Sequence, residues 1–285
     1  MSDNMIHILV SFDKNYIPPF KVMLHSLLVN NPQERFHVWL LQNSIPPDEL
    51  RSLEEYCNVQ SAAFTAVQID GTLFQNAPVS RQYPQEMYYR LLAAQLLPDT
   101  LDRVLYLDPD ILVINPLRPL WETELSGAAL AAASHSWEPD TVNDINRIRL
   151  ETGHDYYNTG VLLMNLERMR RFIVPDEIYN HIREHREELL LPDQDVFNAL
   201  YGKDTVQVDD RLWNYDVRHS QVYRLKSEGI CNTDWVMRNT AILHFCGKNK
   251  PWRAGYINRF GVLYKHYMNL TERQISGRFY QVPEK

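Results

Sequence analysis

Short apolar runs alternate with longer segments of helical period in the first part of the chain. The apolar runs cover residues 6–10, 36–41, 62–69 and 104–107, and the helical segments cover residues 18–28, 47–56 and 85–97. This alternation predicts strands joined by helices, which is typical of a mostly parallel sheet. We therefore expect an α/β fold of Rossmann-like type, with helices covering both faces of the sheet.

The second half of the chain has no internal repeat and no low-complexity segment that would divide it into further domains. A length of 285 residues suits one α/β unit with a C-terminal extension. We assign residues 1–252 to this unit and residues 253–285 to a helical, basic appendage. From Lys248 onward the net charge is about +6. The tail is expected either to contact an anionic membrane surface or to be solvated or docked on the protein.

Charge and cysteine content restrict the class of protein. The formal net charge of -7 and the pI of 5.8 argue against a broad nucleic-acid interface. Cys57, Cys231 and Cys246 lack the spacing of a disulfide framework or a zinc ribbon. Residues 1–10 do not show a basic segment followed by a long apolar stretch, and no later apolar run has membrane-spanning length, so we expect neither a leader nor a membrane span. We expect a cytoplasmic protein, with peripheral attachment at the inner face of the membrane as the alternative, and the oligomeric state is unknown.

The acidic turn Asp108-Pro109-Asp110 follows the apolar run at residues 104–107. Pro109 biases Asp108 toward extended backbone, so that both carboxylates can bend around one cation. Two solvated aspartates in a surface turn are the alternative. A metal site is favoured because ligands of open α/β sheets bind beyond the carboxyl ends of strands.

A second apolar stretch, residues 241–243, precedes His244. A lone histidine here can be a hydrogen-bonded core residue. However, Gly247 permits close backbone approach and Lys250 offers a cation suited to phosphate. Imidazole suits later transition metals, whereas Mg²⁺ prefers oxygen ligands, so we predict Mn²⁺ rather than Mg²⁺. The predicted ligands are Asp108, Asp110 and His244.

Other polar residues lie near predicted strand ends. Asp13 follows the first strand and Asn158 precedes an apolar run, so both are expected at the same sheet edge. Arg90 is either a solvated helix residue or a bridge between phosphate and carboxylate. Gln194 lies between Asp193 and Asp195 before a helix expected at residues 196–200. Either aspartate could cap that helix, but a cap leaves Gln194 unexplained.

Six short motifs, weak individually but strong in this order, resemble glycosyltransferase family 8. These retaining enzymes are related to bacterial lipopolysaccharide galactosyl- and glucosyltransferases and to glycogenin. The motifs occupy residues 11–16, 89–91, 104–110, 157–165, 193–195 and 244–252. The resemblance, over about residues 6–252, implies a GT-A fold, a UDP-hexose donor and a saccharide or glycolipid acceptor.

The resemblance also implies roles for individual residues. Asp13 and Asn15 would contact uridine, with Ser11 and Tyr16 beside them. Asp108, Pro109, Asp110 and His244 would hold the metal and diphosphate, and Gly247 and Lys250 would neutralise the far side of that diphosphate. The sugar would be surrounded by the candidate catalytic residues, which are Arg90, Asn158, Asp193 and Gln194.

Two positions depart from the family pattern. Phe12 is bulky where small residues usually precede the aspartate. Ser134-His135-Ser136 stands where some relatives place an acid that reaches the sugar or acceptor. These departures leave the choice between galactose and glucose undecided.

The motif around Gln194 also bears on mechanism. Because an amide is a poor nucleophile, we favour same-face attack by the acceptor hydroxyl over double displacement through a carboxylate. A metal-dependent phosphodiesterase or nucleotidyltransferase is an alternative, although such sites often hold paired metals. A catalytically silent glycan-binding module and self-glycosylation on tyrosine are further alternatives.

Overall fold

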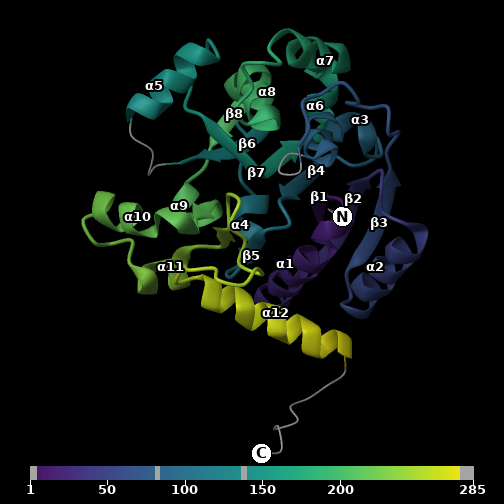
Figure 1. Ribbon diagram of the computed structural model, residues 1–285, viewed down its shortest axis with the longest axis vertical. Coiled ribbons are helices and arrows are strands. Elements are labelled where there is room, and N and C mark those ends of the chain that lie inside the picture. Colours follow the sequence, from purple (N-terminus) through teal and green to yellow (C-terminus); the bar gives the residue numbers. More distant parts are fainter. Residues whose placement is uncertain (1–4, 81–83, 136–139, 277–285) are drawn as a thin grey trace, which may run out of the picture.

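A seven-stranded sheet forms the centre of the computed structural model, which describes residues 5–80, 84–135 and 140–276 (Figure 1). In spatial order its strands are β3 (Ala63–Gln68), β2 (Arg35–Gln42), β1 (Met5–Ser11), β4 (Arg103–Leu107), β7 (Tyr157–Asn165), β6 (Leu130–Ser134) and β8 (Thr205–Gln207). β7 runs antiparallel to both neighbours, and the other pairings are parallel. The predicted mostly parallel α/β sheet is confirmed, with β7 as the reversed strand.

Side-chain alternation along the strands produces one core on each face of the sheet. On β1, Ile6, Ile8 and Val10 pack toward α1 (Ile17–Asn30) and α2 (Pro47–Val59), whereas Leu9 belongs to the opposite core. Figure 1 shows α1 and α2 on one side of the sheet. The opposite side is covered by α3 (Ala93–Leu96), α6 (Leu166–Phe172), α7 (Pro175–Glu184) and α8 (Pro192–Tyr201).

A small second sheet lies beside the large one and carries part of the site. Its central strand, β10 (Ile242–His244), is antiparallel to β5 (Ile111–Val113) and parallel to β9 (Tyr215–Asp216). A third core supports this sheet. The surrounding elements are α9 (Asp210–Trp213), α10 (Ser220–Lys226), α11 (Thr233–Asn239) and α12 (Gly261–Ser276).

The remaining elements are short or peripheral. They are η1 (Lys14–Tyr16), α4 (Arg118–Trp121), α5 (Asp140–Arg149), η3 (Gly202–Asp204) and η4 (Val217–His219). None of the helices in the three described ranges is long and apolar enough to cross a bilayer. In the predicted tail, α12 packs against α1, and Figure 1 shows the two helices next to each other. Residues 277–285 of that tail, and Ser136, lie outside the described residues.

The α-helix predicted over residues 85–97 is wrong in its geometry. Residues Gln85–Leu92 form the 3-10 helix η2, and only Ala93–Leu96 are α-helical. Arg90 Nε donates to the carbonyl oxygen of Met87 at 2.9 Å, and this contact accompanies the tighter winding. The 3-10 segment directs the guanidinium of Arg90 into the sheet edge described below.

Candidate functional site

Pairing between β5 and β10 brings the acidic turn and His244 together. The backbone N–H of Asp108 donates to the carbonyl oxygen of Gly160 at 2.8 Å, and His244 lies opposite Ile111 in the small sheet. His244 Nε2 is 3.3 Å from Asp110 Oδ1 and 3.7 Å from Asp108 Oδ2. One ligand atom from each of the three residues lies within 4.8 Å of the others. The arrangement can accommodate one cation between an imidazole and two carboxylates.

A chain of side-chain amides fixes the orientation of His244. Asn214 Oδ1 lies 2.8 Å from His244 Nδ1, and Asn214 Nδ2 donates to Asn158 Oδ1 at 2.8 Å. Asn158 Nδ2 in turn donates to Gln194 Oε1 at 3.0 Å. With Nδ1 directed at the amide oxygen of Asn214, Nε2 is the ring nitrogen of His244 that faces the two carboxylates.

Gly160 gives the histidine and the acidic turn room to meet. A Cβ atom at this position would lie 2.3 Å from His244 Cε1 and 2.8 Å from Asp108 Oδ2. Both distances are shorter than any non-bonded contact that a real side chain tolerates. The strand β7 therefore requires glycine here for a steric reason rather than for an unusual backbone angle.

Lys250 places its ammonium group on the second oxygen of Asp110. Lys250 Nζ donates to Asp110 Oδ2 and, at 3.1 Å, to the carbonyl oxygen of Phe245. Burial alone would raise the pKa of Asp110, but the charges of Lys250 and His244 hold it below its ordinary value. The carboxylate is thus kept ionised, with Oδ1 toward His244 and Oδ2 toward the lysine.

Arg90 is buried and connects the acidic turn with α8. Its NH2 group lies 2.9 Å from Asp108 Oδ1, and its Nε lies 3.5 Å from Asp193 Oδ2. The guanidinium also stacks 4.2 Å from the centre of the Tyr106 ring. Burial favours a lower pKa for Arg90, but Asp108, Tyr106 and Asp193 raise it above its ordinary value. The interpretation of Arg90 as a solvated helix residue is therefore wrong.

The first turn of α8 places Asp193 and Gln194 at the cleft but caps the helix with neither aspartate. The residue at the cap position is Leu191, which makes no side-chain capping bond. Asp193 Oδ2 accepts a hydrogen bond from Thr159 Oγ1 at 3.1 Å, and burial raises the pKa of Asp193 against the effect of Arg90. Asp195 is fully buried and accepts hydrogen bonds from Arg149 and from the backbone of residues 190 and 191. The capping hypothesis is wrong because both carboxylates satisfy other partners.

The segment after β1 forms the opposite wall of the site. Asp13 accepts hydrogen bonds from the backbone N–H and the side chain of Asn15, at 2.9 and 2.8 Å. Tyr16 meets Trp252 edge to face, with ring centres 5.9 Å apart. Ser11 lies deeper, with its Oγ 3.3 Å from the Tyr106 hydroxyl. This wall of the site is therefore aromatic at Tyr16 and polar at Asp13 and Asn15.

One cleft of about 930 Å³ lies between these segments. Every residue that the sequence assigned to the site lines it, namely Ser11, Asp13, Asn15, Tyr16, Arg90, Asp108, Pro109, Asp110, Asn158, Asp193, Gln194, His244, Gly247 and Lys250. The volume lies within the range of small-molecule and cofactor sites. The cleft is thus large enough for a nucleotide-sized ligand and places the candidate metal ligands in its wall.

Several residues that organise the site were not predicted from the sequence. Asn214 lies in an irregular segment between α9 and β9, with no motif around it. Tyr106 donates to Asp108 Oδ1 at 2.8 Å, although in the sequence it is one residue of an apolar run. Thr159 and Gly160 lie inside the motif at residues 157–165. Their small side chains were the feature of the sequence that could have indicated a close approach of other segments to this strand.

Comparisons with known proteins agree with the fold and the motif order. The model of the family described as "Glycosyl transferase family 8" matches residues 7–255. General stress protein A of Bacillus subtilis (strain 168) is 29% identical over 286 residues, covering 96% of this chain and 97% of that protein. Lipopolysaccharide 1,2-glucosyltransferase of Escherichia coli (strain K12) is 24% identical, covering 87% of this chain and 72% of that protein. A crystal structure of the galactosyltransferase LgtC superimposes with a TM-score of 0.79 at 22% identity, covering 98% of both chains.

Proposed function

Because the chain belongs to glycosyl transferase family 8, we propose that it transfers galactose or glucose from a UDP-sugar to a hydroxyl of a saccharide or glycolipid. We further propose that the anomeric configuration is retained. The observation that carries the proposal is the single cleft that unites Asp108, Asp110 and His244 with Arg90 and α8. The similarity to a lipopolysaccharide 1,2-glucosyltransferase supports a hexose donor and a saccharide acceptor.

Three side chains of the cleft have the chemistry of ligands for a divalent metal ion. Asp108, Asp110 and His244 converge, Asn214 orients the imidazole, and Gly160 leaves the space they need. A carboxylate and imidazole set favours Mn²⁺, with Mg²⁺ as the alternative ion. When bound, the metal would supply positive charge to the diphosphate of the donor, which becomes more negative as it departs. Pro109 separates the two carboxylates in the turn that presents them.

Lys250 and Gly247 would face the diphosphate from the other side. The ammonium of Lys250 already lies within the cleft on Asp110, from where a flexible side chain can reach a phosphate oxygen. Gly247 has a positive φ of 87°, a backbone conformation that other residues rarely adopt. The lysine would therefore stabilise negative charge on the leaving group.

Arg90, Asn158, Asp193 and Gln194 would surround the transferred sugar. Asp193 and Arg90 form a buried charged pair, which supplies fixed hydrogen-bonding groups for sugar hydroxyls. Gln194 Oε1 accepts from Asn158, so its partial negative charge is held in one place. That oxygen would stabilise the positive charge that develops at the anomeric carbon.

We propose same-face substitution as the chemical step. The acceptor oxygen bonds to the anomeric carbon while the bond from that carbon to the diphosphate oxygen breaks on the same face of the sugar. The proton of the acceptor hydroxyl passes to the departing phosphate. Asp193, the carboxylate next to Gln194, is held by Arg90 and Thr159, which favours a positioning role over attack on the sugar.

Donor hydrolysis across a set of UDP-sugars tests the proposal. With Mn²⁺ present, UDP should be released from UDP-galactose or UDP-glucose, and chelation of the metal should stop the release. NMR of the product formed with a saccharide acceptor should show the anomeric configuration of the donor. Absence of UDP release from every UDP-sugar tested, or a nucleotide exchange product, would contradict the proposed reaction.

A further inference from the structure

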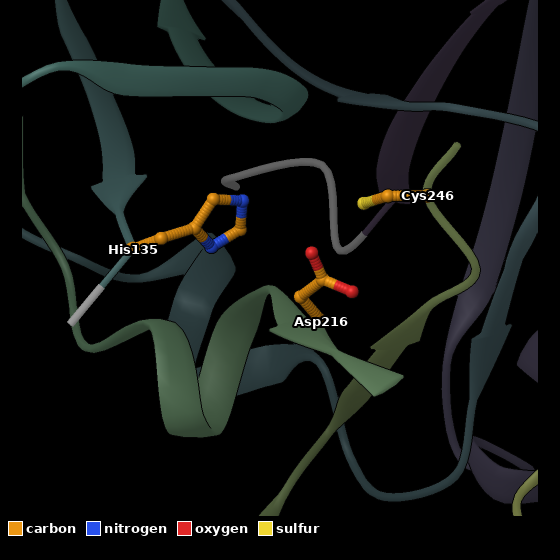
Figure 2. A group of neighbouring side chains, drawn as sticks. All are labelled: His135, Asp216 and Cys246. Carbon is orange, nitrogen blue, oxygen red and sulfur yellow. The ribbon is translucent and has the colours of Figure 1, made fainter. Parts of the chain in front are cut away.

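His135, Asp216 and Cys246 form a second cluster of metal-ligating side chains. His135 follows β6, Asp216 ends β9, and Cys246 lies two residues beyond His244. One possible ligand atom from each lies within 4.8 Å of the others. Figure 2 shows the imidazole, the carboxylate and the thiol pointing into the same space from three separate segments of the chain.

The second ring nitrogen of His135 faces a buried carboxylate. His135 Nδ1 lies 3.8 Å from Asp210 Oδ2, and the same oxygen accepts the hydroxyl hydrogen of Tyr223 at 2.6 Å. A metal-bound histidine commonly directs its other N–H to a carboxylate, which fixes the ring orientation and increases its basicity. With Nδ1 on the side of Asp210, Nε2 is the nitrogen suited to face an ion.

Asp216 is held as an ionised carboxylate by Arg218. Arg218 donates from Nε to Oδ1 at 3.0 Å and from NH2 to Oδ2 at 2.6 Å, and its backbone N–H also donates to Oδ1. A carboxylate keeps further lone pairs after such contacts and can still bind an ion. The nearby guanidinium weakens the attraction for any dication. A bound ion must therefore gain strongly from its sulfur and nitrogen ligands.

We propose that His135, Asp216 and Cys246 form a second metal site, which takes a thiophilic divalent ion of the zinc class. Cysteine, histidine and aspartate are all zinc ligands, whereas Mn²⁺ and Mg²⁺ gain little from a thiolate. Three protein ligands leave one coordination position for water or a hydroxyl group. Because Cys246 lines the cleft, the ion would lie at its wall, beside the Asp108, Asp110 and His244 group.

Cobalt substitution tests this site without reference to enzyme activity. The full-length protein is stripped of metal by a chelator and titrated with Co²⁺. We expect a thiolate-to-cobalt charge-transfer absorption that saturates at one equivalent per chain and disappears when Zn²⁺ is added. C246S should abolish this band, and H135Q should weaken Co²⁺ binding at the thiolate by at least about tenfold.

Two control variants show whether the absorption band comes from the proposed site. C231S removes another buried thiol and should keep the band, and D110N disables the other metal group and should also keep it. Circular dichroism confirms that each variant is folded. The inference fails if the wild-type protein gives no thiolate band at saturating Co²⁺, or if C246S retains it. Neither result would change the expected release of UDP with Mn²⁺ as the only metal. The cobalt titration therefore tests the second metal site independently of the proposed function.

Discussion

Asp110 is the residue on which the two cationic partners of the acidic turn converge. Its Oδ1 faces His244 at 3.3 Å, and its Oδ2 accepts from the ammonium of Lys250. Replacement by asparagine keeps the shape but removes the charge that both partners use. We expect D110N to lower Mn²⁺-dependent UDP release by about 100-fold or more, because a bound metal supplies several kcal/mol of charge stabilisation.

The matched control for this variant is D99N. Asp99 is 98% exposed, and its contact with Arg170 is a surface ion pair at 3.5 Å. Its replacement should leave UDP release within about twofold, since such pairs contribute little. Equal rates for D110N and the wild-type protein in a steady-state UDP assay would remove Asp110 from the metal group.

Asn214 acts on the metal group through His244 rather than by direct contact. N214A removes the acceptor that orients the imidazole and also the donor to Asn158. Loss of such an outer contact typically weakens metal affinity by about 10–100-fold. Calorimetric titration with Mn²⁺ should show this loss, whereas N239A, on an exposed side chain of α11, should bind Mn²⁺ as the wild type does. Unchanged affinity in N214A would contradict the orienting role.

At the scale of the element, the reversed strand β7 supplies a position without a side chain beneath His244. G160A adds a methyl group that would overlap His244 Cε1 and Asp108 Oδ2. The strand has to shift, or the histidine has to leave its position, so we expect Mn²⁺ affinity and UDP release to fall at least about tenfold. Calorimetry and the UDP assay measure these two effects.

The matched control for G160A is G153A, in the segment before β7. A Cβ atom there meets no atom within 4 Å, so G153A should retain both metal binding and turnover. Normal Mn²⁺ affinity in G160A would show that the strand accommodates the methyl group, contrary to the steric argument.

Helix α8 is anchored by Asp195 rather than capped by it. Its carboxylate pairs with Arg149 at 2.8 Å and accepts from the Tyr156 hydroxyl and the backbone of residues 190 and 191. D195A leaves the guanidinium and these donors without their acceptor, at a cost of about 3–5 kcal/mol in the free energy of unfolding. Urea denaturation should show a lower midpoint.

A control variant in the first turn of α7 distinguishes anchoring by Asp195 from the general effect of a negative charge near a helix N-terminus. Asp176 lies in the first turn of α7 and is exposed. D176A should cost no more than about 1 kcal/mol, as expected for a charge near a helix N-terminus. Similar losses in D195A and D176A would contradict the anchoring role of Asp195.

At the scale of the whole molecule, α12 completes the third core and so supports the small sheet that carries His244. Tyr264 is fully buried in this core, against Phe245 with ring centres 5.1 Å apart. Y264A should reduce the free energy of unfolding by about 3–5 kcal/mol, because a large cavity would form. Thermal unfolding should show a clear decrease in Tm.

The control on the same helix is V262A, since Val262 is 76% exposed. We expect a change within about 0.5 kcal/mol for this variant. If Y264A unfolded like the wild-type protein, α12 would be an accessory helix instead of part of the fold.

Much of the architecture follows from local sequence patterns. Apolar runs at residues 6–10, 36–41 and 104–107 became β1, β2 and β4, because burial of both strand faces requires continuous apolar residues. The 3-10 winding of η2 could not be predicted in this way. Within this 3-10 helix, the side chain of Arg90 contacts Asp108 and Thr159 in other segments, and no local pattern specifies these contacts.

Local sequence patterns were sufficient to predict the α/β class, the acidic turn after an apolar strand and the residue types that converge on the cleft. These features depend on periodicity, on the restriction imposed by Pro109 and on the chemistry of each side chain. The folded chain was needed to show that Asp110 pairs with Lys250, 140 residues away, and that Asn214 orients His244. It also showed that Asp195 is an anchor and that His135, Asp216 and Cys246 meet. Such contacts join distant segments, and no local pattern specifies which of many partners a polar side chain will find.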